Sequence, residues 1–334
     1  MAQIKQILVT GGAGYIGSHT AKELRVQGYE PVVLDNLCHG HRWAVRWGPF
    51  VEGDLSNRGT LHNIFREYRF EAVIHFAAFA YVGESMHAPS EYFRNNFVNT
   101  LNLLDAMRES GVRPIVFSST CATYGIPEKV PIAENHSQNP VNPYGETKLM
   151  VERALGWYER AYGLAWTALR YFNAAGADAA GEIGEVHDPE THLIPRTIAA
   201  AYGDISSLEV FGTDYSTPDG TAVRDYIHVT DLATAHVKAL ERLRAGAASQ
   251  AFNLGTGSGH SVREVIAAVE RASGRAVPVT ECGRRAGDPA MLVADASLAA
   301  RELSWSAEHS SLDEIVGTAC RWYANARALE QRGA

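Results

Sequence analysis

Short apolar runs alternate with amphipathic segments along the first half of the chain. Runs rich in Val, Ile and Phe lie at Ile7–Thr10, Pro31–Leu34, Phe50–Val51, Ala72–His75, Pro114–Ser118 and Trp166–Tyr171. They are nearly continuous rather than alternating, which is typical of parallel strands covered on both faces. Helical stretches separate them at Gly17–Val26, Thr60–Tyr68 and Tyr92–Arg108, and another follows Pro143. The repeated β-α-β order predicts an α/β fold with a doubly wound parallel sheet.

The pattern changes after Asn173. Residues Ala174–Pro195 are rich in Gly, Ala, Asp and His and lack helical periodicity, which predicts a loop region. Further helices and strands are expected at Leu193–Tyr202, Leu208–Phe211 and Asp231–Leu243. We therefore expect residues 1–172 to form one domain and residues 173–334 to form mainly a smaller α/β region, with segments at about 210–250 returning to the first domain.

The composition narrows the class of protein. The 334 residues include 46% apolar and 20% charged residues, which is typical of a globular protein. A formal net charge of −8 argues against electrostatic binding to nucleic acid or to an anionic membrane. No apolar run approaches the roughly 18 residues that a membrane span needs, and the first residues lead into a strand without a signal peptide. The four cysteines lie far apart without a C-x-x-C pair, so the cytoplasm is the expected location.

A glycine-rich turn ends the first predicted strand and opens the first predicted helix. Gly12, Gly14 and Gly17 satisfy G-x-G-x-x-G, a spacing that lets backbone amides approach a pyrophosphate at a helix N-terminus. Asp35 closes the second strand 23 positions after Gly12, where a carboxylate accepts hydrogen bonds from ribose hydroxyls and repels a 2′-phosphate. The pattern predicts a Rossmann-type dinucleotide-binding domain and favours NAD over NADP.

Two details of this cofactor site stay open on the sequence. Arg42 and Arg46 lie near Asp35, and basic side chains there could accommodate the 2′-phosphate of NADP. Asp54 follows the third strand, where its carboxylate could accept from the adenine amine. The alternative for Asp54 is to cap the next helix at its N-terminus.

A tyrosine and a lysine four positions apart supply the candidate chemistry. Pro143 suits the first turn of a helix, and Tyr144 and Lys148 then share one face of it. This helix follows the strand that ends near Thr120, and ligands bind at the carboxyl ends of parallel strands. A tyrosine, with an ordinary pKa of about 10, serves as a base at neutral pH only where positive charge favours its phenolate. We predict Tyr144 as base, Lys148 as its cation and Thr120 as a hydroxyl partner of the substrate; the alternative for Thr120 is to cap its own backbone.

These motifs resemble the extended short-chain dehydrogenase/reductases nearly from end to end. The resemblance rests on Thr10–Gly17, Asp35–Leu37, Val82–Ser85, Asn95–Asn96, Phe117–Thr120, Tyr124–Gly125, Tyr144 with Lys148, Arg170–Asn173 and Arg224–Val229. The most similar members are those that epimerise UDP-sugars, which implies an isomerase that interconverts UDP-glucose and UDP-galactose. By this resemblance Tyr144 takes the proton of the sugar 4-hydroxyl while hydride passes from C4 to NAD. The 4-keto sugar then turns over and hydride returns to its other face.

The resemblance also implies which residues hold each ligand. The expected NAD-binding residues are Gly11, Gly12, Gly14, Tyr15, Ile16, Gly17, Asp35, Asn36, Asp54, Leu55, Phe76, Ala77, Ala78, Asn95, Tyr144, Lys148 and Phe172. The expected UDP-sugar-binding residues are Thr120, Tyr144, Asn173, Leu193, Phe211, Arg224, Arg285, Asp288 and Leu292. A homodimer is implied as well.

Three positions depart from the pattern of relatives. Thr120 stands where several members have serine, and Ala80 stands where some have a lysine that contacts the cofactor. Leu292 stands where certain members have a tyrosine against the sugar. A smaller side chain there predicts room for an N-acetyl group, so UDP-GlcNAc and UDP-GalNAc are further candidate substrates.

Other functions stay open at this level. A nucleotide-sugar 4,6-dehydratase on the same fold generally has an acidic residue beside the catalytic hydroxyl, where this chain has Cys121 and Ala122. Another nucleotide-sugar oxidoreductase would exchange NAD in each cycle, and a dinucleotide-sensing binding protein would not need the Tyr/Lys pair. His187 and His192 share a loop, but no third ligand has convincing spacing, so no metal is predicted.

Overall fold

A seven-stranded parallel sheet forms the larger part of the molecule. The computed structural model describes residues 5–285 and 287–333. The strands follow the order β11-β6-β5-β4-β1-β2-β3, which contains the Rossmann order 3-2-1-4-5-6 and confirms the predicted fold class. Their bounds are β1 Gln6–Thr10, β2 Glu30–Asp35, β3 Phe50–Glu52, β4 Phe70–His75, β5 Pro114–Thr120, β6 Ala165–Tyr171 and β11 Gln250–Leu254.

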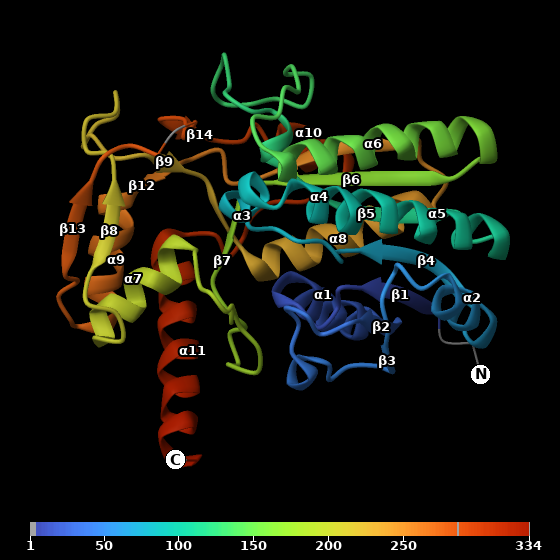
Figure 1. Cartoon of the computed structure of the whole chain (residues 1–334), viewed down its shortest axis with the longest axis horizontal. Coiled ribbons are helices and arrows are strands. Elements are labelled where there is room, and N and C mark those ends of the chain that lie inside the picture. Colours follow the sequence, from blue (N-terminus) through green and yellow to red (C-terminus); the bar gives the residue numbers. More distant parts are fainter. Residues whose placement is uncertain (1–4, 286, 334) are drawn as a thin grey trace.

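Helices cover both faces of this sheet (Figure 1). One face packs against α1 (Tyr15–Val26) and α8 (Val229–Arg244), and the other against α2 (Arg58–Glu67), α5 (Asn99–Ser110) and α6 (Pro143–Tyr162). The buried side chains of β1 alternate accordingly, since Ile7 and Val9 belong to the first core and Leu8 to the second. Burying such a side chain contributes about 1.5–3 kcal/mol, so both layers hold the strands in register.

The helix expected at Tyr92–Arg108 is not one continuous α-helix. After α3 (Val82–His87), the chain forms α4 (Pro89–Tyr92), a π-helix η2 (Phe93–Val98) and then α5. Asn96 of the π-helix is buried, and its side-chain amide accepts from the Phe79 N–H at 2.8 Å and donates to the Phe79 carbonyl at 2.9 Å. Hydrophobic periodicity does not report this kind of irregularity, because a polar side chain causes the local change in pitch.

A smaller α/β region lies beside the sheet and carries its own core (Figure 1). It contains α7 (Leu193–Tyr202), α9 (Val262–Ser273), α11 (Leu312–Gly333) and the parallel strands β8 (Leu208–Phe211) and β13 (Val279–Cys282). The remaining elements are η1 Arg42–Ala44, η3 Cys121–Thr123, β7 Asn173–Ala175, β9 Val223–Arg224, β10 Tyr226–His228, β12 His260–Ser261, β14 Met291–Leu292 and α10 Ser297–Glu302. The expected loop is therefore shorter than Ala174–Pro195, because β7 occupies its start and α7 begins at Leu193.

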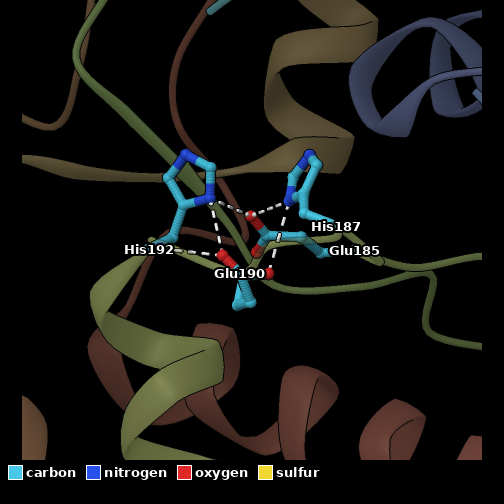
Figure 2. A group of neighbouring side chains, drawn as sticks. All are labelled: Glu185, His187, Glu190 and His192. Carbon is cyan, nitrogen blue, oxygen red and sulfur yellow. Dashed lines mark hydrogen bonds and ion pairs between the residues drawn. The ribbon is translucent and has the colours of Figure 1, made fainter. Parts of the chain in front are cut away.

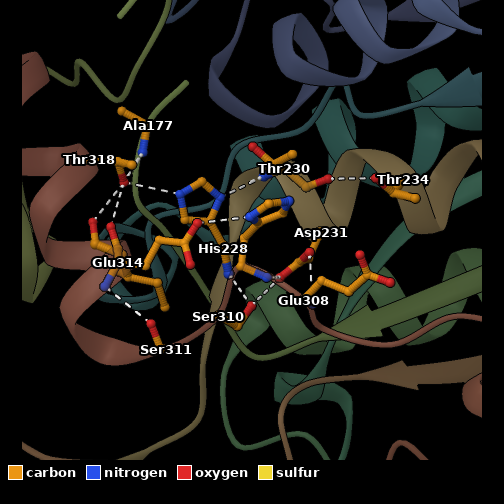
Figure 3. A network of polar contacts seen from close by, with 12 residues as sticks. Ala177, His228, Thr230, Asp231, Thr234, Glu308, Ser310, Ser311, Glu314 and Thr318 are labelled. Carbon is orange, nitrogen blue, oxygen red and sulfur yellow. Dashed lines mark hydrogen bonds and ion pairs between the residues drawn. The ribbon is translucent and has the colours of Figure 1, made fainter. Parts of the chain in front are cut away.

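A buried polar network joins this region to α8 (Figure 3). Asp231 accepts from the Ser310 hydroxyl at 2.5 Å and from the backbone N–H of His309 at 2.9 Å. His228 caps α8 by accepting from the Thr230 N–H at its Nδ1, so its Nε2 carries the proton and donates to Thr318 of α11 at 3.0 Å. The network fixes the start of α8 against α11. Within residues 5–285 and 287–333, no helix is long and apolar enough to cross a membrane.

Candidate active site

The glycine turn between β1 and α1 is packed too tightly for side chains. Gly11 has φ of +71°, and a Cβ there would lie 2.5 Å from the backbone nitrogen of Ala77. A Cβ on Gly17 would lie 2.3 Å from the Gly11 carbonyl oxygen. Gly14 is the N-cap of α1, and among the described residues no side chain caps this end and no acidic residue lies in its first turn. The backbone N–H groups of Tyr15, Ile16 and Gly17 in that first turn therefore remain available to an anion.

Asp35 lies at the end of β2 beside this turn. Its two carboxylate oxygens accept from the backbone N–H groups of Ala13 at 3.0 Å and Leu37 at 2.9 Å. Each oxygen keeps further acceptor capacity, which suits ribose hydroxyls. Gly40 lies against the carboxylate, since a Cβ there would be 2.9 Å from Oδ1. Burial raises the pKa of Asp35, and the two backbone hydrogen bonds oppose that shift.

Asp54 lies after β3 and does not cap the following helix. The N-cap of α2 is Asn57, whose side chain accepts from the N–H groups of Gly59 and Thr60. The capping alternative for Asp54 is therefore wrong, because the chain turns once more between Asp54 and the helix. Asp54 instead accepts from the Ser56 N–H at 2.7 Å and from the Asn36 side chain. Leu55 follows it and is buried.

The segment after β4 closes the other side of the glycine turn. The backbone N–H groups of Phe76 and Ala77 donate to the Thr10 carbonyl at 2.9 and 3.1 Å, and Ala78 follows them. His75 bonds to the Thr10 hydroxyl through Nδ1 at 2.7 Å and to the Thr100 hydroxyl through Nε2 at 2.8 Å. These bonds join the ends of β1 and β4 to α5. The expected NAD-binding residue Asn95 lies on the adjacent π-helix.

The predicted catalytic side chains meet at the carboxyl end of β5. Asn142 caps α6 by accepting from the Gly145 N–H at 2.8 Å, and this start of the helix places Tyr144 beside the end of β5. The hydroxyl of Thr120 lies close enough to the Tyr144 phenol to favour its phenolate, and it accepts from the Ala122 N–H at 3.1 Å. Thr120 thus caps its own backbone and contacts the tyrosine at the same time. Lys148 lies one turn further along α6, with its Nζ 5.9 Å from the centre of the Tyr144 ring.

Burial shifts the pKa of both ionisable groups away from the charged form. Desolvation raises the pKa of Tyr144 well above its ordinary value, and the Thr120 hydrogen bond opposes this shift only in part. Desolvation lowers the pKa of Lys148 to about 7, and the nearby Glu152 carboxylate opposes that shift. In the protein alone the phenol is therefore neutral at pH 7, and a phenolate needs additional positive charge beside it.

Glu152 is a further residue of this site that our sequence analysis did not identify. It lies one turn beyond Lys148 on α6, so an i, i+4 search along the same face would have found it. Its carboxylate accepts from the Ser119 hydroxyl at 2.5 Å and binds Arg170 through two guanidinium nitrogens, at 3.0 and 2.6 Å. The Glu152 carboxylate is therefore ion-paired with Arg170, and its negative charge also acts on the nearby Lys148.

Most of the expected UDP-sugar-binding residues follow β6 in the chain, whereas Thr120 and Tyr144 belong to the group at the end of β5. Arg224 of β9 is ion-paired with Asp288, and the pairing of β9 with β14 places Arg224 opposite Leu292. The guanidinium of Arg285 lies 3.8 Å from the centre of the Phe211 ring. Two others begin elements, since Asn173 begins β7 and Leu193 begins α7. Phe172, which is expected to bind NAD, lies buried between β6 and β7.

A cluster of two histidines and two glutamates lies in the loop between β7 and α7 (Figure 2). The expectation that His187 and His192 lack further ligands nearby is wrong, since Glu185 and Glu190 lie within hydrogen-bonding distance of both rings. The spacing E-x-H-x-x-E-x-H carried this signal. The two carboxylates raise the pKa of His187 to about 9 and of His192 to about 10, although burial opposes both shifts.

The fold and the site define a dinucleotide-binding enzyme of the Rossmann type with a tyrosine and a lysine at the end of its fifth strand. Residues 7–255 match the NAD dependent epimerase/dehydratase family, and the chain belongs to that family. Membership confirms the resemblance to the short-chain dehydrogenase/reductases and the choice of NAD as cofactor.

Similar proteins cover nearly the whole chain. A UDP-glucose 4-epimerase from Rhizobium leguminosarum bv. trifolii is 52% identical over 318 residues, which span 95% of this chain and 97% of the relative. The crystal structure of UDP-glucose 4-epimerase from Brucella ovis in complex with NAD is 56% identical, with a TM-score of 0.94 over 95% of this chain and 98% of that one. The enzyme from Bifidobacterium longum in complex with NAD⁺ and UDP is 38% identical, with a TM-score of 0.91 over 97% of this chain and 99% of that one.

Proposed function

We propose that the protein interconverts UDP-glucose and UDP-galactose by transient oxidation at C4 of the sugar, with NAD as its cofactor. The observation that carries this proposal is the placement of Tyr144 near Thr120 at the carboxyl end of β5, with Lys148 one helical turn away. The relatives from Rhizobium leguminosarum and Brucella ovis, both named UDP-glucose 4-epimerase, support the choice of substrate.

The chain fits a bound NAD at three places. The uncapped first turn of α1 suits the pyrophosphate, and Asp35 keeps acceptor capacity for ribose hydroxyls. Gly11 has no side chain and lies against the backbone of Ala77, so a ligand can approach the carboxyl ends of β1 and β4 closely. When bound, the oxidised nicotinamide supplies a reversible hydride acceptor. The other NAD-binding residues predicted from the sequence stay part of the proposal.

Tyr144 is the proposed base for the sugar 4-hydroxyl. Its phenolate accepts the proton as C4 is oxidised and returns it as C4 is reduced, so the tyrosine ends each cycle unchanged. Because burial opposes the phenolate, the ammonium of Lys148 must favour it. The Thr120 hydroxyl orients the same sugar oxygen by hydrogen bonding.

The smaller region is proposed to hold the UDP group. Guanidinium groups of Arg224 and Arg285 suit phosphate oxygens, and Arg224 is already oriented by Asp288. With UDP anchored there, the hexose needs few fixed contacts, which leaves the 4-keto sugar free to turn over between the two hydride transfers. The other residues of the predicted UDP-sugar set contribute to this proposal by their positions in the same region.

The decisive experiment incubates the purified protein with UDP-glucose and adds no cofactor. Steady formation of UDP-galactose without net NADH is the expected result, since the oxidation is reversed within each cycle. A 4-keto-6-deoxy product would instead indicate a 4,6-dehydratase, and stoichiometric NADH would indicate a net oxidoreductase. Burial raises the pKa of the Cys121 thiol to about 12, so this residue is a poor substitute for the acid that a dehydratase uses.

UDP-GlcNAc is a second proposed substrate. Leu292 lies opposite Arg224 in the β9–β14 pair, and its partly buried side chain packs on the cluster that contains Phe172. A leucine occupies less space than a tyrosine, so an N-acetyl group could be accommodated there. The same assay with UDP-GlcNAc should yield UDP-GalNAc, and Leu292→Tyr should reduce this activity more than turnover of UDP-glucose. Absence of turnover with UDP-GlcNAc would contradict the proposal.

We also propose a cytoplasmic homodimer. Trp157 and Tyr162 of α6 are 65% and 49% exposed, so this helix presents two large aromatic side chains that a partner could cover. Light scattering after size-exclusion chromatography should give twice the mass of the chain, and Trp157→Glu should shift it toward the monomer. All four cysteines are free, which fits a reducing compartment.

Residues 1–172 with the returning segment would bind NAD, and residues 173–334 would bind mainly the UDP-sugar.

A further inference from the structure

Four potential metal ligands converge in the loop between β7 and α7, separate from the proposed catalytic group on α6. Glu185, His187, Glu190 and His192 each offer one ligand atom, and these atoms all lie within 4.8 Å of one another. Figure 2 shows that both rings turn Nδ1 toward the two carboxylates. Nδ1 of His187 is 3.3 Å from Oε1 of Glu185 and from Oε2 of Glu190, and Nδ1 of His192 is 3.0 Å from the same Glu185 oxygen and 2.9 Å from Oε1 of Glu190.

These separations approach those of a tetrahedral zinc site. Zinc bonds to nitrogen and oxygen measure about 2.0–2.2 Å, which places neighbouring ligand atoms roughly 3.3–3.5 Å apart. The nitrogen–oxygen separations of 2.9–3.3 Å are shorter by a few tenths of an ångström and involve both oxygens of Glu190. One of these two oxygens would bind, and a small movement of the side chains would admit the ion. The side chains of Glu185 and His187 are only 8% and 18% exposed, so two of the ligands are held within the packed structure.

The donor set selects the kind of ion. Two carboxylates neutralise a divalent cation, and two imidazoles complete the four ligands once each has released to solvent the proton that it shares with the carboxylates. Imidazole nitrogen favours zinc and neighbouring transition metals, whereas magnesium and calcium prefer larger sets of oxygen ligands. Four protein ligands leave no open position for a substrate or water, which is typical of a structural rather than a catalytic zinc site.

We propose that Glu185, His187, Glu190 and His192 bind one zinc ion that fixes the loop between β7 and α7. The loop already contacts the rest of the protein on both sides. The Val186 carbonyl lies 3.1 Å from His41 Nε2, and the Glu185 carbonyl accepts from Trp322 at 3.1 Å. His187 also packs edge-on against Tyr15 of the glycine turn. Because His192 is followed directly by the first residue of α7, the ion would tie the start of that helix to the NAD-binding side of the molecule.

The test uses untagged protein that has been stripped with a chelator and dialysed. Calorimetric titration with Zn²⁺ should show one saturable site per chain, and Mg²⁺ should not compete for it. Co²⁺ in place of zinc should give the strong visible absorption of a four-coordinate ion with nitrogen and oxygen ligands. The double variant His187→Gln/His192→Gln should bind Zn²⁺ more than roughly 100-fold more weakly. Its matched control, His62→Gln/His87→Gln, removes two exposed histidines elsewhere and should bind like the wild type.

Several outcomes would overturn the proposal. They are the absence of a saturable zinc site, equal affinity in both double variants, or the weak Co²⁺ spectrum of a six-coordinate ion. Thiolate-to-Co²⁺ absorption would place the ion at a cysteine such as the exposed Cys38 instead. If the double variant does not fold, the Co²⁺ spectrum of the unmodified protein and the single variant Glu190→Gln decide the question. Zn²⁺ should also raise the melting temperature of the wild type but not that of a folded site variant.

Discussion

The ammonium group of Lys148 donates a hydrogen bond of 2.8 Å to the backbone carbonyl of Ser118. This bond joins the second turn of α6 to the carboxyl end of β5. Lys148 is only 3% exposed. Burial lowers its pKa to about 7. A bonded amine at this position is fixed in space, and its charge responds to the charges around it.

Lys148→Met should lower turnover by about 10²–10⁴-fold. The variant keeps the length of the side chain but removes the cation that favours the Tyr144 phenolate. The remaining activity should therefore rise at higher pH than in the wild type, because the tyrosine loses its proton less readily. Rates of UDP-galactose formation across a pH series measure both effects.

Lys238→Met is the matched control for this prediction. Lys238 also donates its Nζ hydrogen bond to a backbone carbonyl, that of Ser304, but it lies on α8 at the surface. This variant should keep the wild-type rate and pH profile. A Lys148→Met enzyme that is slow but retains the wild-type pH profile would mean that the lysine acts only through packing.

Tyr144→Phe should retain NAD and lose turnover by at least about 10²-fold. The substitution removes the phenol that contacts Thr120 but leaves the ring and the helix start in place. Tyr158→Phe removes another phenol from the same helix, one that donates to Asp105 at 2.9 Å, and should remain active. Bound nucleotide is measured by absorbance after denaturation. Near-normal turnover in Tyr144→Phe would identify a different base.

The parts of the site that the sequence predicted are those set by local chain geometry. Gly17 and Asp35 lie in short β-α-β segments whose spacing fixes their relation to a dinucleotide. Tyr144 and Lys148 share a helix face because four positions make about one turn. In each case the residues lie close together along the chain, so a period or a spacing was enough to relate them.

Other features depend on contacts between distant segments, and the sequence did not reveal them. The π-helix around Asn96 follows from bonds to Phe79 across a loop, which no periodicity records. Arg170 of β6 reaches Glu152 of α6, so only the folded structure shows that this arginine neutralises the carboxylate next to Lys148. Local spacing brought two histidines together in the β7–α7 loop but did not show that both carboxylates turn inward.

Gly17→Ala should reduce the NAD content of the purified protein strongly. A Cβ at this position would lie 2.3 Å from the Gly11 carbonyl, so the glycine turn must move to admit it. Gly156→Ala is a matched change in α6, where a Cβ meets nothing within 4 Å. This second variant should keep its NAD and gain up to about 1 kcal/mol in the free energy of unfolding, because alanine favours helix. Equal NAD content in the two variants would contradict a tight packing role for Gly17.

Acid should destabilise the protein through its buried histidines, of which His236 is the clearest case. His236 is fully buried in α8, its Nδ1 bonds the Leu232 carbonyl at 2.8 Å, and its Nε2 has no partner among the described residues. Burial lowers its pKa to about 4, whereas the unfolded chain has the ordinary value of about 6.5. The unfolded state therefore binds a proton first, and stability falls as the pH drops from about 6.5 toward 4.

The variant His236→Gln isolates this contribution. Glutamine has an amide that can donate to the Leu232 carbonyl, but it does not titrate. Between about pH 7.5 and pH 5.5, the wild type should lose about 1 kcal/mol more of its free energy of unfolding than the variant does. His62→Gln, which removes an exposed histidine, should lose as much as the wild type. Urea unfolding at both pH values measures these differences. Parallel losses in wild type and His236→Gln would mean that His236 takes up its proton at the same pH in the folded and unfolded states. That result would require an acceptor or a water path at Nε2, which its packing does not provide.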